Sequence, residues 1–361
     1  MKTEKDLNHG WTRMDPDESS PRPSPSRRGG IAGRARRGGA AADWGDSGFC
    51  PATADVLVRG AAAVYGETRE MEAWAEEQAC ETCAVAGNEA TDTLAFVAAA
   101  RDCGYVVFRG TRDLRNWLSD LDCRRVAADM VKAEGRRQKA ETDGRKVHEG
   151  FAVALASIEE ELEEILAGWG AAGKTVFFAG HSLGGALAML AAARREDQRV
   201  SGGSPVLPWV YTFGQPRVGN RAWAKWYDGL MRERSFRVVH ADDVVARVPW
   251  LMGSFRHAGH EVFFPRMDRT DRSDGTDRTD RTNGMGEAAL LDPSWVGKLP
   301  FDLCGLWRRH TLDLEALLAD HHVDSYVALL QWQTAIQCGR PDPSGPLNQG
   351  REGPATFCNP Q

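Results

Sequence analysis

The feature that most constrains the fold is a serine flanked by glycines between an apolar run and an alanine-rich run. The apolar run is 175–179, the sequence at 180–184 is Gly-His-Ser-Leu-Gly, and the helical pattern covers 183–195. A strand followed by G-x-S-x-G and a helix is typical of a nucleophile elbow, which holds Ser182 on a sharp turn. Flanking side chains would collide in such a turn, so Gly180 and Gly184 are needed. The alternative is a phosphate-binding turn, but this segment does not have the G-x-x-x-x-G-K-[ST] pattern of such turns.

Apolar runs and helical patterns alternate on both sides of this turn. We predict strands at 93–100, 105–108, 175–179, 209–213, 236–240 and 260–264, and helices at 183–195 and 221–231. One further amphipathic helix carries its apolar face on Phe151, Leu155, Ile158, Leu162, Ile165 and Leu166, with glutamates opposite. This alternation predicts an α/β fold with a mostly parallel central sheet covered by helices.

Composition divides the chain into one domain with loose ends. Residues 1–48 are rich in Pro, Gly, Ser and Arg, and we expect a disordered tail there, although an organelle transit peptide is an alternative. The domain is expected at 49–336, with a disordered insertion at about 266–286. Within it, 268–282 reads as five Asp-x-Thr or Asp-x-Ser triplets, for which a calcium-binding repeat is the alternative. Residues 339–361 are predicted to form a second disordered tail.

Charge and composition exclude several classes of function. The net charge is −6, and the first 42 residues carry +4, which leaves −10 on the remainder. A domain with this net negative charge is not expected to bind nucleic acid, because nucleic-acid binding depends mainly on clustered Lys and Arg. No run of 18 apolar residues and no apolar leader is present, so we expect neither a transmembrane segment nor a signal peptide, and a cytoplasmic or organellar location rather than secretion.

The cysteines do not predict a metal site. Among the eight cysteines, Cys80 and Cys83 form the one close pair. A Cys₄ zinc site usually needs a second such pair. A local disulfide or two reduced thiols is therefore favoured over metal, and we expect no metal and no cofactor.

A serine hydroxyl is a weak nucleophile, so it needs a general base and an acid that orients the base. In this architecture the chain order is serine, acid, histidine. Asp242 and Asp243 lie just past the C-terminal end of the predicted strand at 236–240, where an active-site carboxylate belongs. A turn-forming role is the alternative for this pair.

Downstream of these aspartates lie His257, His260, His310, His321 and His322. The first two flank the predicted strand at 260–264, which favours structural roles for them. The last two precede a helical pattern, and a loop at that point can direct an imidazole toward Ser182. We predict His321 as the base, with His322 as the alternative.

At this point the sequence resembles the class 3 lipase family, the fungal-lipase-like branch of the α/β hydrolases. The resemblance covers about 60–335, with the family core at about 105–252, and is interrupted by the triplet insertion. It rests on Val-Phe-Arg-Gly-Thr at 107–111 with Asn-Trp at 116–117, Val-His-Glu-Gly-Phe at 147–151, Gly-His-Ser-Leu-Gly-Gly at 180–185, Thr-Phe-Gly-Gln-Pro-Arg-Val-Gly-Asn at 212–220, and Asp-His at 320–321.

The resemblance implies an α/β-hydrolase fold and a serine lipase or esterase that hydrolyses lipid esters, such as acylglycerols, through an acyl-enzyme. It implies Ser182 as nucleophile, Asp243 as the acid of the triad and His321 as general base. Thr111 and the backbone N–H of Leu183 correspond to the oxyanion hole of the family. The alternatives are a phospholipase A1, a feruloyl-type esterase, or an inactive lipase-like scaffold.

An apolar stripe at helical spacing follows the expected oxyanion residue, with charged residues opposite. Its members are Leu114, Trp117, Leu118 and Leu121. Periodicity alone fits ordinary core packing equally well. The resemblance implies that the segment is a lid, so peripheral contact with lipid interfaces is expected. It also implies a disulfide between Cys80 and Cys83.

Overall fold

A computed structural model describes residues 48–112, 125–127, 144–168, 174–202, 206–249, 255–265 and 318–337. Among these residues, seven strands form one sheet in the order β1-β2-β3-β6-β7-β8-β9. Their bounds are β1 Thr82–Asn88, β2 Thr93–Ala99, β3 Cys103–Phe108, β6 Thr175–His181, β7 Leu207–Phe213, β8 Ser235–His240 and β9 His260–Phe264. A separate antiparallel pair joins β4, Arg125–Ala127, to β5, Lys146–His148.

The sheet is parallel where it carries the serine. Strands β3, β6, β7, β8 and β9 run parallel to their neighbours, and β1 and β2 add an antiparallel edge. In register, Gly180 of β6 lies between Phe108 of β3 and Thr212 of β7. Parallel strands bring their carboxyl ends to one edge of the sheet, where ligand sites of open α/β sheets form.

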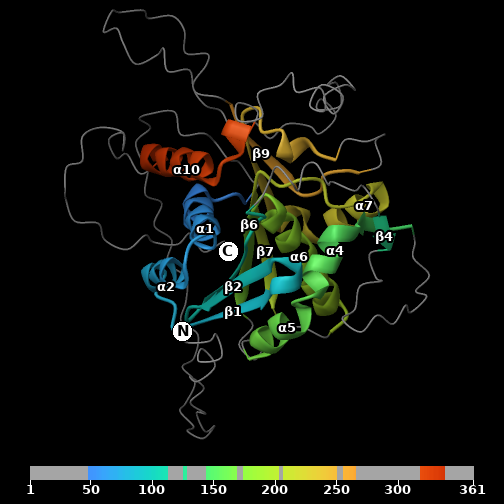
Figure 1. Ribbon diagram of the computed structural model, residues 1–361. Coiled ribbons are helices and arrows are strands. Elements are labelled where there is room, and N and C mark those ends of the chain that lie inside the picture. Colours follow the sequence, from blue (N-terminus) through green and yellow to red (C-terminus); the bar gives the residue numbers. More distant parts are fainter. Residues whose placement is uncertain are drawn as a thin grey trace, which may run out of the picture. The chain divides into compact units, whose positions relative to one another are not determined.

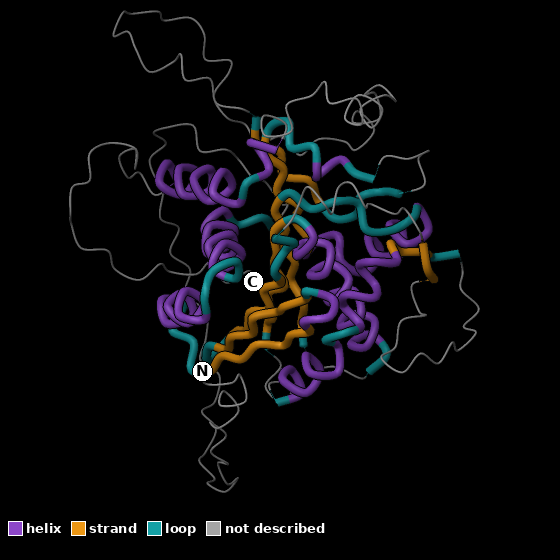
Figure 2. Tube along the Cα trace, viewed as in Figure 1, coloured by secondary structure: helices purple, strands orange, loops and turns teal. Residues whose placement is uncertain are grey.

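Helices cover both faces of the sheet (Figures 1 and 2). The helices α1 Pro51–Ala63, α2 Thr68–Glu77 and α10 Val323–Gln337 lie on one face, and α4 Glu149–Ala156, α5 Glu159–Ala167, α6 Leu183–Val200 and α7 Arg221–Met231 lie on the other. The short 3₁₀ turns are η3 Glu89–Thr91, η5 Arg232–Arg234, η6 Val245–Arg247 and η10 Ala319–His321. Each face has its own apolar cluster, and strand residues alternate between the two.

The predicted α/β-hydrolase architecture is confirmed, and most predicted elements agree with the structure within a few residues. One element differs. The single amphipathic helix expected from Phe151 to Leu166 is divided into α4 and α5. At the break, the Ser157 hydroxyl hydrogen-bonds to Ala154 O and to the Thr91 hydroxyl, each over 2.7 Å. A serine side chain bonded to a nearby carbonyl competes with helix continuation, and Thr91 anchors it to the sheet side.

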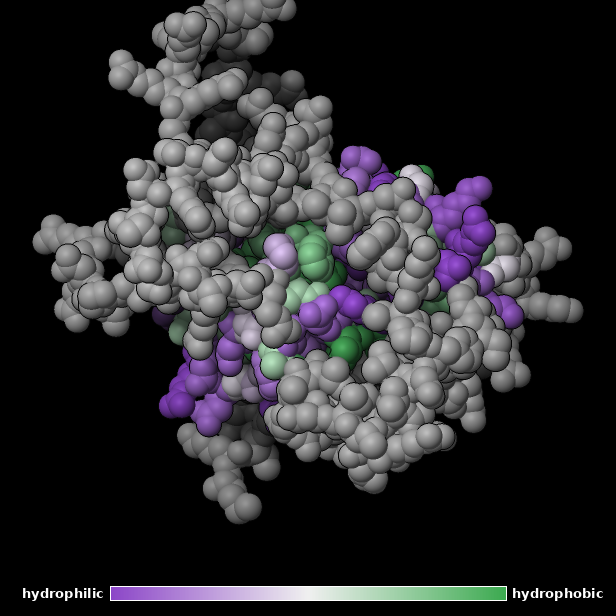
Figure 3. Space-filling model, turned by 90° about the horizontal axis from the view of Figure 1, so that it is seen from above, coloured by the Kyte–Doolittle hydropathy of each residue, from purple (hydrophilic) through white to green (hydrophobic). Residues whose placement is uncertain are grey.

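Several predictions fall outside the described residues. These are the tail at 1–48 except residue 48, the insertion at about 266–286, the tail at 339–361 and the apolar stripe after Thr111. Within the described part of the chain, no helix is both long and apolar enough to cross a membrane. Seen from above the sheet, hydrophobic residues gather at the centre of the face in Figure 3, with hydrophilic residues beside them.

Candidate active site

Ser182 lies on the turn between β6 and α6 with backbone angles that side chains rarely adopt. Its φ is 58° and its ψ is −128°, a conformation that costs a non-glycine residue about 1–3 kcal/mol. The Ser182 N–H donates to Phe213 O in β7 over 2.9 Å, and the Gly185 N–H donates to Ser182 O over 3.0 Å. The strained serine is therefore held by the neighbouring strand and by the first turn of α6.

The flanking glycines allow a close backbone approach, as the sequence pattern predicted. A Cβ atom at Gly180 would lie 2.3 Å from the carbonyl carbon of Gly184. A Cβ atom at Gly184 would lie 2.2 Å from Phe108 O in β3. Both obstacles are backbone atoms, so no rotation of a side chain can relieve them. The start of α6 therefore packs directly against the end of β3.

Replacing Gly184 with alanine is expected to lower the free energy of unfolding by about 3 kcal/mol, because overpacking forces the backbone to shift. The matched control is Gly229→Ala in α7, where a Cβ atom would meet nothing within 4 Å. Alanine there should raise the free energy of unfolding by about 0.5–1 kcal/mol, since glycine is unfavourable inside a helix. Urea unfolding followed by tryptophan fluorescence measures both. Equal changes in the two variants would contradict the packing argument.

Asp243 lies on the turn after β8 and is fully buried. Its Oδ1 accepts from the backbone N–H groups of Val245, over 2.8 Å, and Ala246, over 3.3 Å. Its Oδ2 is 2.8 Å from His321 Nδ1 and accepts from the Tyr326 hydroxyl over 2.6 Å. Burial raises the pKa of this carboxyl, but His321 and Tyr326 lower it by more, and the net pKa lies below the ordinary value. Asp243 is therefore an ionised acceptor at neutral pH.

The structure separates the two aspartates and the two histidines that the sequence left open. The Asp242 side chain is 77% exposed and lies 3.5 Å from the Arg247 guanidinium. The His322 side chain is exposed, whereas that of His321 is only 1% exposed. Asp243 and His321 are thus brought together, and their sequence neighbours point elsewhere.

The protonation of His321 follows from its partner. An ionised carboxylate only accepts, so Nδ1 carries the proton and donates to Asp243, and Nε2 keeps a free lone pair. Among the described residues, neither His321 Nε2 nor Ser182 Oγ has a hydrogen-bond partner, and both atoms are buried. Leaving a buried polar group unpaired costs about 1–3 kcal/mol, so such atoms call for an explanation, and a catalytic role is one.

Tyr326 is a site residue that the sequence analysis did not single out. Its hydroxyl donates to Asp243 Oδ2 and accepts from His240 N–H over 3.2 Å. Burial, followed by the charge of Asp243, raises the pKa of this hydroxyl well above its usual value. The tyrosine therefore remains a neutral donor that fixes the carboxylate. Its position five residues after His321 was the one signal in the sequence.

Comparison with known families gives one match for this chain. The profile of the class 3 lipases matches residues 105–252, a range that begins in β3 and contains both Ser182 and Asp243. Over this range the chain is similar to the class 3 lipase family.

Relatives of the chain are lipases by name. The chain is 35% identical over 161 residues to a lipase of Rhizomucor miehei. The aligned region covers 44% of this chain and 40% of that lipase. It is 33% identical over 159 residues to the secreted mono- and diacylglycerol lipase 1 of Fusarium solani. That aligned region covers 43% of this chain and 42% of the relative. The matches therefore span less than half the length of either relative. A fungal lipase solved with an inhibitor superposes with a TM-score of 0.50 at 27% identity, over 60% of this chain and 80% of that one.

The expected oxyanion donors lie just after β3 and at the start of α6. Thr111 follows β3 by three residues and is partly buried. Leu183 is the first residue of α6, so its N–H is among the helix donors that have no intrahelical acceptor. The positive end of the α6 dipole also lies at this point. The apolar stripe expected as a lid lies outside the described residues.

The cysteine pair differs from what the family resemblance implied. Cys80 and Cys83 both carry free thiols. Cys80 packs against the apolar cluster beneath α1 and α2, whereas Cys83 is exposed on β1. The two thiols therefore lie in different environments. Burial, followed by the nearby Cys103 and Cys83, raises the pKa of Cys80 to about 12, so this thiol is unreactive at neutral pH.

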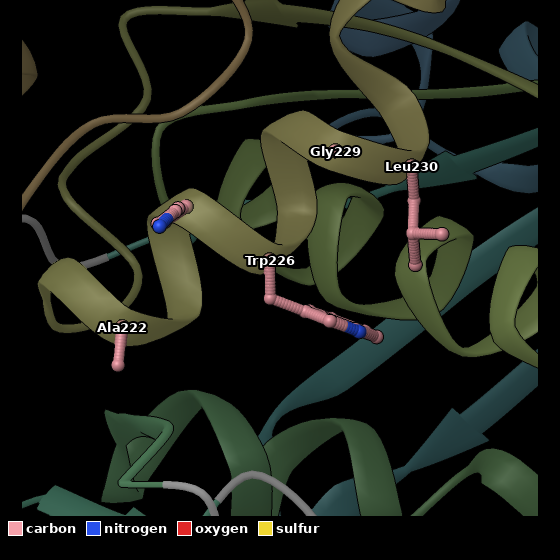
Figure 4. Close-up of a pocket in the computed structure, with 5 residues that line it drawn as sticks. Ala222, Trp226, Gly229 and Leu230 are labelled. Carbon is pink, nitrogen blue, oxygen red and sulfur yellow. The ribbon is translucent and has the colours of Figure 1, made fainter.

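Neither a metal centre nor the pocket on α7 accounts for the site. Among the described residues, no group of three His, Cys, Asp or Glu side chains could hold a metal ion. A pocket is lined by Ala222, Lys225, Trp226, Gly229 and Leu230. Figure 4 shows that Ala222, Trp226 and Leu230 leave α7 on the same side. None of the predicted catalytic residues lines this pocket, so it is separate from the elbow.

Proposed function

We propose that this chain is a serine hydrolase of the class 3 lipase type, which hydrolyses carboxylic esters of lipids, of the acylglycerol type, through an acyl-enzyme on Ser182. The observation that carries the proposal is the buried Asp243–His321 hydrogen bond, combined with an unpartnered Ser182 hydroxyl on a strained elbow. The names of the lipase relatives support the substrate class. Peripheral contact with lipid interfaces follows as part of the proposal.

The proposed mechanism begins with proton transfer. As Ser182 Oγ attacks the ester carbonyl carbon, its proton moves to His321 Nε2, and the carbonyl electron pair becomes an oxyanion. The Thr111 hydroxyl and the Leu183 N–H donate to this oxyanion, and such a donor is typically worth about 3–4 kcal/mol. Asp243 stabilises the imidazolium without taking its proton.

The second half of the cycle reverses these roles. The tetrahedral intermediate collapses, the bond to the alcohol oxygen breaks, and His321 Nε2 protonates that oxygen as the alcohol leaves. A water molecule then gives its proton to His321 and attacks the acyl carbon. Collapse of the second intermediate releases the fatty acid and returns the proton to Ser182 Oγ. Every proton is carried by groups within this chain.

A fluorophosphonate probe tests the nucleophile. We expect the folded full-length chain to be labelled once per molecule and Ser182→Ala to be unlabelled, because the elbow serine is the proposed nucleophile, activated by His321. Circular dichroism establishes that both proteins are folded. A folded wild type that takes no label would overturn the proposal in favour of the inactive scaffold.

Ester profiling tests the substrate class. We expect p-nitrophenyl esters of medium and long acyl chains to be cleaved faster than the acetate, with a rise in rate when an emulsified triacylglycerol interface forms. Preference for acetate or for feruloyl esters would instead support the esterase alternative. Release of the sn-1 acyl chain from phosphatidylcholine vesicles in preference to acylglycerols would support a phospholipase A1.

A further inference from the structure

One chain of contacts, two of them hydrogen bonds, connects the three segments that carry the proposed catalytic groups. These are the oxyanion loop (109–111), the elbow (180–184) and the base turn η10 (Ala319–His321). We propose that Tyr65 and His181 form a positioning pair that holds these three segments in register. The inference deepens the proposed function and rests on it, because it concerns how the hydrolytic groups are aligned.

The contacts run in sequence through two side chains. The Tyr65 hydroxyl oxygen lies directly against the backbone of Gly110. That hydroxyl lies 3.0 Å from His181 Nδ1. On the other side of the ring, His181 Nε2 lies 2.6 Å from the backbone oxygen of His321. The pair therefore spans from the backbone beside Thr111 to the backbone of the base.

Chemistry allows only one direction for these hydrogen bonds. A carbonyl oxygen only accepts, so His181 Nε2 must donate to His321 O. A neutral imidazole has a single N–H, which leaves Nδ1 as an acceptor. The Tyr65 O–H therefore donates to Nδ1, and its oxygen faces the backbone of Gly110. Reversing the link between Tyr65 and His181 would leave Nε2 without a proton to donate to His321 O.

His181 remains neutral because of where it lies. Burial, followed by the nearby His321, lowers the pKa of His181 to about 3. The two imidazole rings have centroids 4.5 Å apart at an interplanar angle of 34°. A neutral ring at that distance adds no positive charge to oppose the imidazolium that forms on His321 during proton transfer. The packing also restricts the orientation of the base.

The fit around Tyr65 is tight. A Cβ atom at Gly110 would lie 2.1 Å from the Tyr65 hydroxyl oxygen and 2.8 Å from His181 O. The oxyanion loop thus rests directly on the tyrosine and on the elbow backbone. Since catalytic groups must be held within about 0.5 Å, a contact at this distance is well placed to set the position of Thr111.

Tyr65→Phe removes one oxygen, its hydrogen bond to His181 and its contact with the Gly110 backbone. We expect kcat to fall about tenfold with KM changed less than about twofold, because one lost buried hydrogen bond corresponds to about a tenfold change in rate. The matched control is Tyr227→Phe, which removes a buried hydroxyl bonded to Ser235 Oγ over 2.8 Å. It should destabilise the fold similarly and leave kcat unchanged. Equal kcat values for the two variants would overturn the inference.

His181 is tested by a pair of substitutions. His181→Leu removes the donor to His321 O, and kcat should fall at least about tenfold. His181→Gln can return an N–H toward that oxygen, so it should recover most of the loss. Equal kcat values for the leucine and glutamine variants would contradict a positioning role. If the leucine variant fails to fold, the tyrosine pair and the measurement below still decide.

Nitrogen-15 NMR of histidine-labelled full-length protein tests the hydrogen-bond chain without any substrate. The His181 signal, assigned by its loss in His181→Gln, should report a neutral ring protonated on Nε2 from pH 8 down to pH 5. In Tyr65→Phe, the Nδ1 resonance should move, because its donor is gone. A ring protonated on Nδ1, or one that titrates near pH 6.5, would overturn the inference.

The two proposals fail in different ways. A wild type that resists the fluorophosphonate but shows the expected His181 resonances would reject the hydrolytic function and keep the hydrogen-bond chain. A reactive wild type, with Tyr65→Phe indistinguishable from Tyr227→Phe, would reject the positioning pair alone.

Discussion

His321→Ala is expected to lower kcat by about 10⁶, because removing the base of a serine triad costs nearly as much as removing all its members. The ring is 1% exposed, and its Nδ1 is hydrogen-bonded to Asp243 Oδ2. With Nε2 gone, the Ser182 proton has no acceptor. Hydrolysis of p-nitrophenyl esters, followed over hours at high enzyme concentration, covers the range required.

The adjacent histidine provides the control. His322 is exposed, so His322→Ala should change kcat by less than about twofold. This pair also resolves the one-residue ambiguity that the doubled histidine leaves in the sequence. If His322→Ala inactivated the enzyme while His321→Ala did not, the proposed assignment of the base would be wrong.

Asp243→Asn is expected to lower kcat about 10⁴-fold, because asparagine would hold His321 in the tautomer that cannot act as a base. Two backbone N–H groups point at the Oδ1 side, so the asparagine oxygen will face them and its NH₂ will face His321. To accept from that NH₂, His321 Nδ1 must lose its proton, which then resides on Nε2. The base can no longer accept the Ser182 proton. Single-turnover kinetics separate this loss from a change in substrate binding.

Asp242→Asn is the matched substitution one residue earlier. Its carboxylate is largely exposed, so kcat should stay within about twofold of wild type. Histidine NMR supplies the independent readout, because the His321 proton should move from Nδ1 to Nε2 in Asp243→Asn only. Loss of activity in Asp242→Asn, with Asp243→Asn active, would reverse the assignment of the acid.

Local sequence patterns were sufficient to predict the fold and the elbow. The runs around 175–183 combine the apolar period of a strand, two glycines and a helical repeat, and each is a short-range signal. The helix break at Ser157 could not be read in the same way, because its cause is a contact with Thr91, 66 residues away in sequence. The periodicity continues unbroken through that point.

Hydrogen-bond partners far apart in the chain could not be predicted either, because no local sequence pattern indicates such contacts. Tyr326 meets Asp243 across 83 residues and Tyr65 meets His181 across 116. A tyrosine on an apolar face has the same pattern whether its hydroxyl binds a catalytic carboxylate or water. The doubled Asp and His pairs were ambiguous because neighbours on a turn differ in direction, which only the folded backbone determines.

The elbow contacts the ends of three strands, β3, β6 and β7, so its geometry depends on all three being in place. Ser182 is bonded to β7, while Gly184 is pressed against β3, and both follow β6. These strands come from segments up to about a hundred residues apart, and such long-range pairing is slow to form. Phosphonylation of the serine should therefore count correctly assembled molecules during refolding, and its time course would report completion of the central sheet.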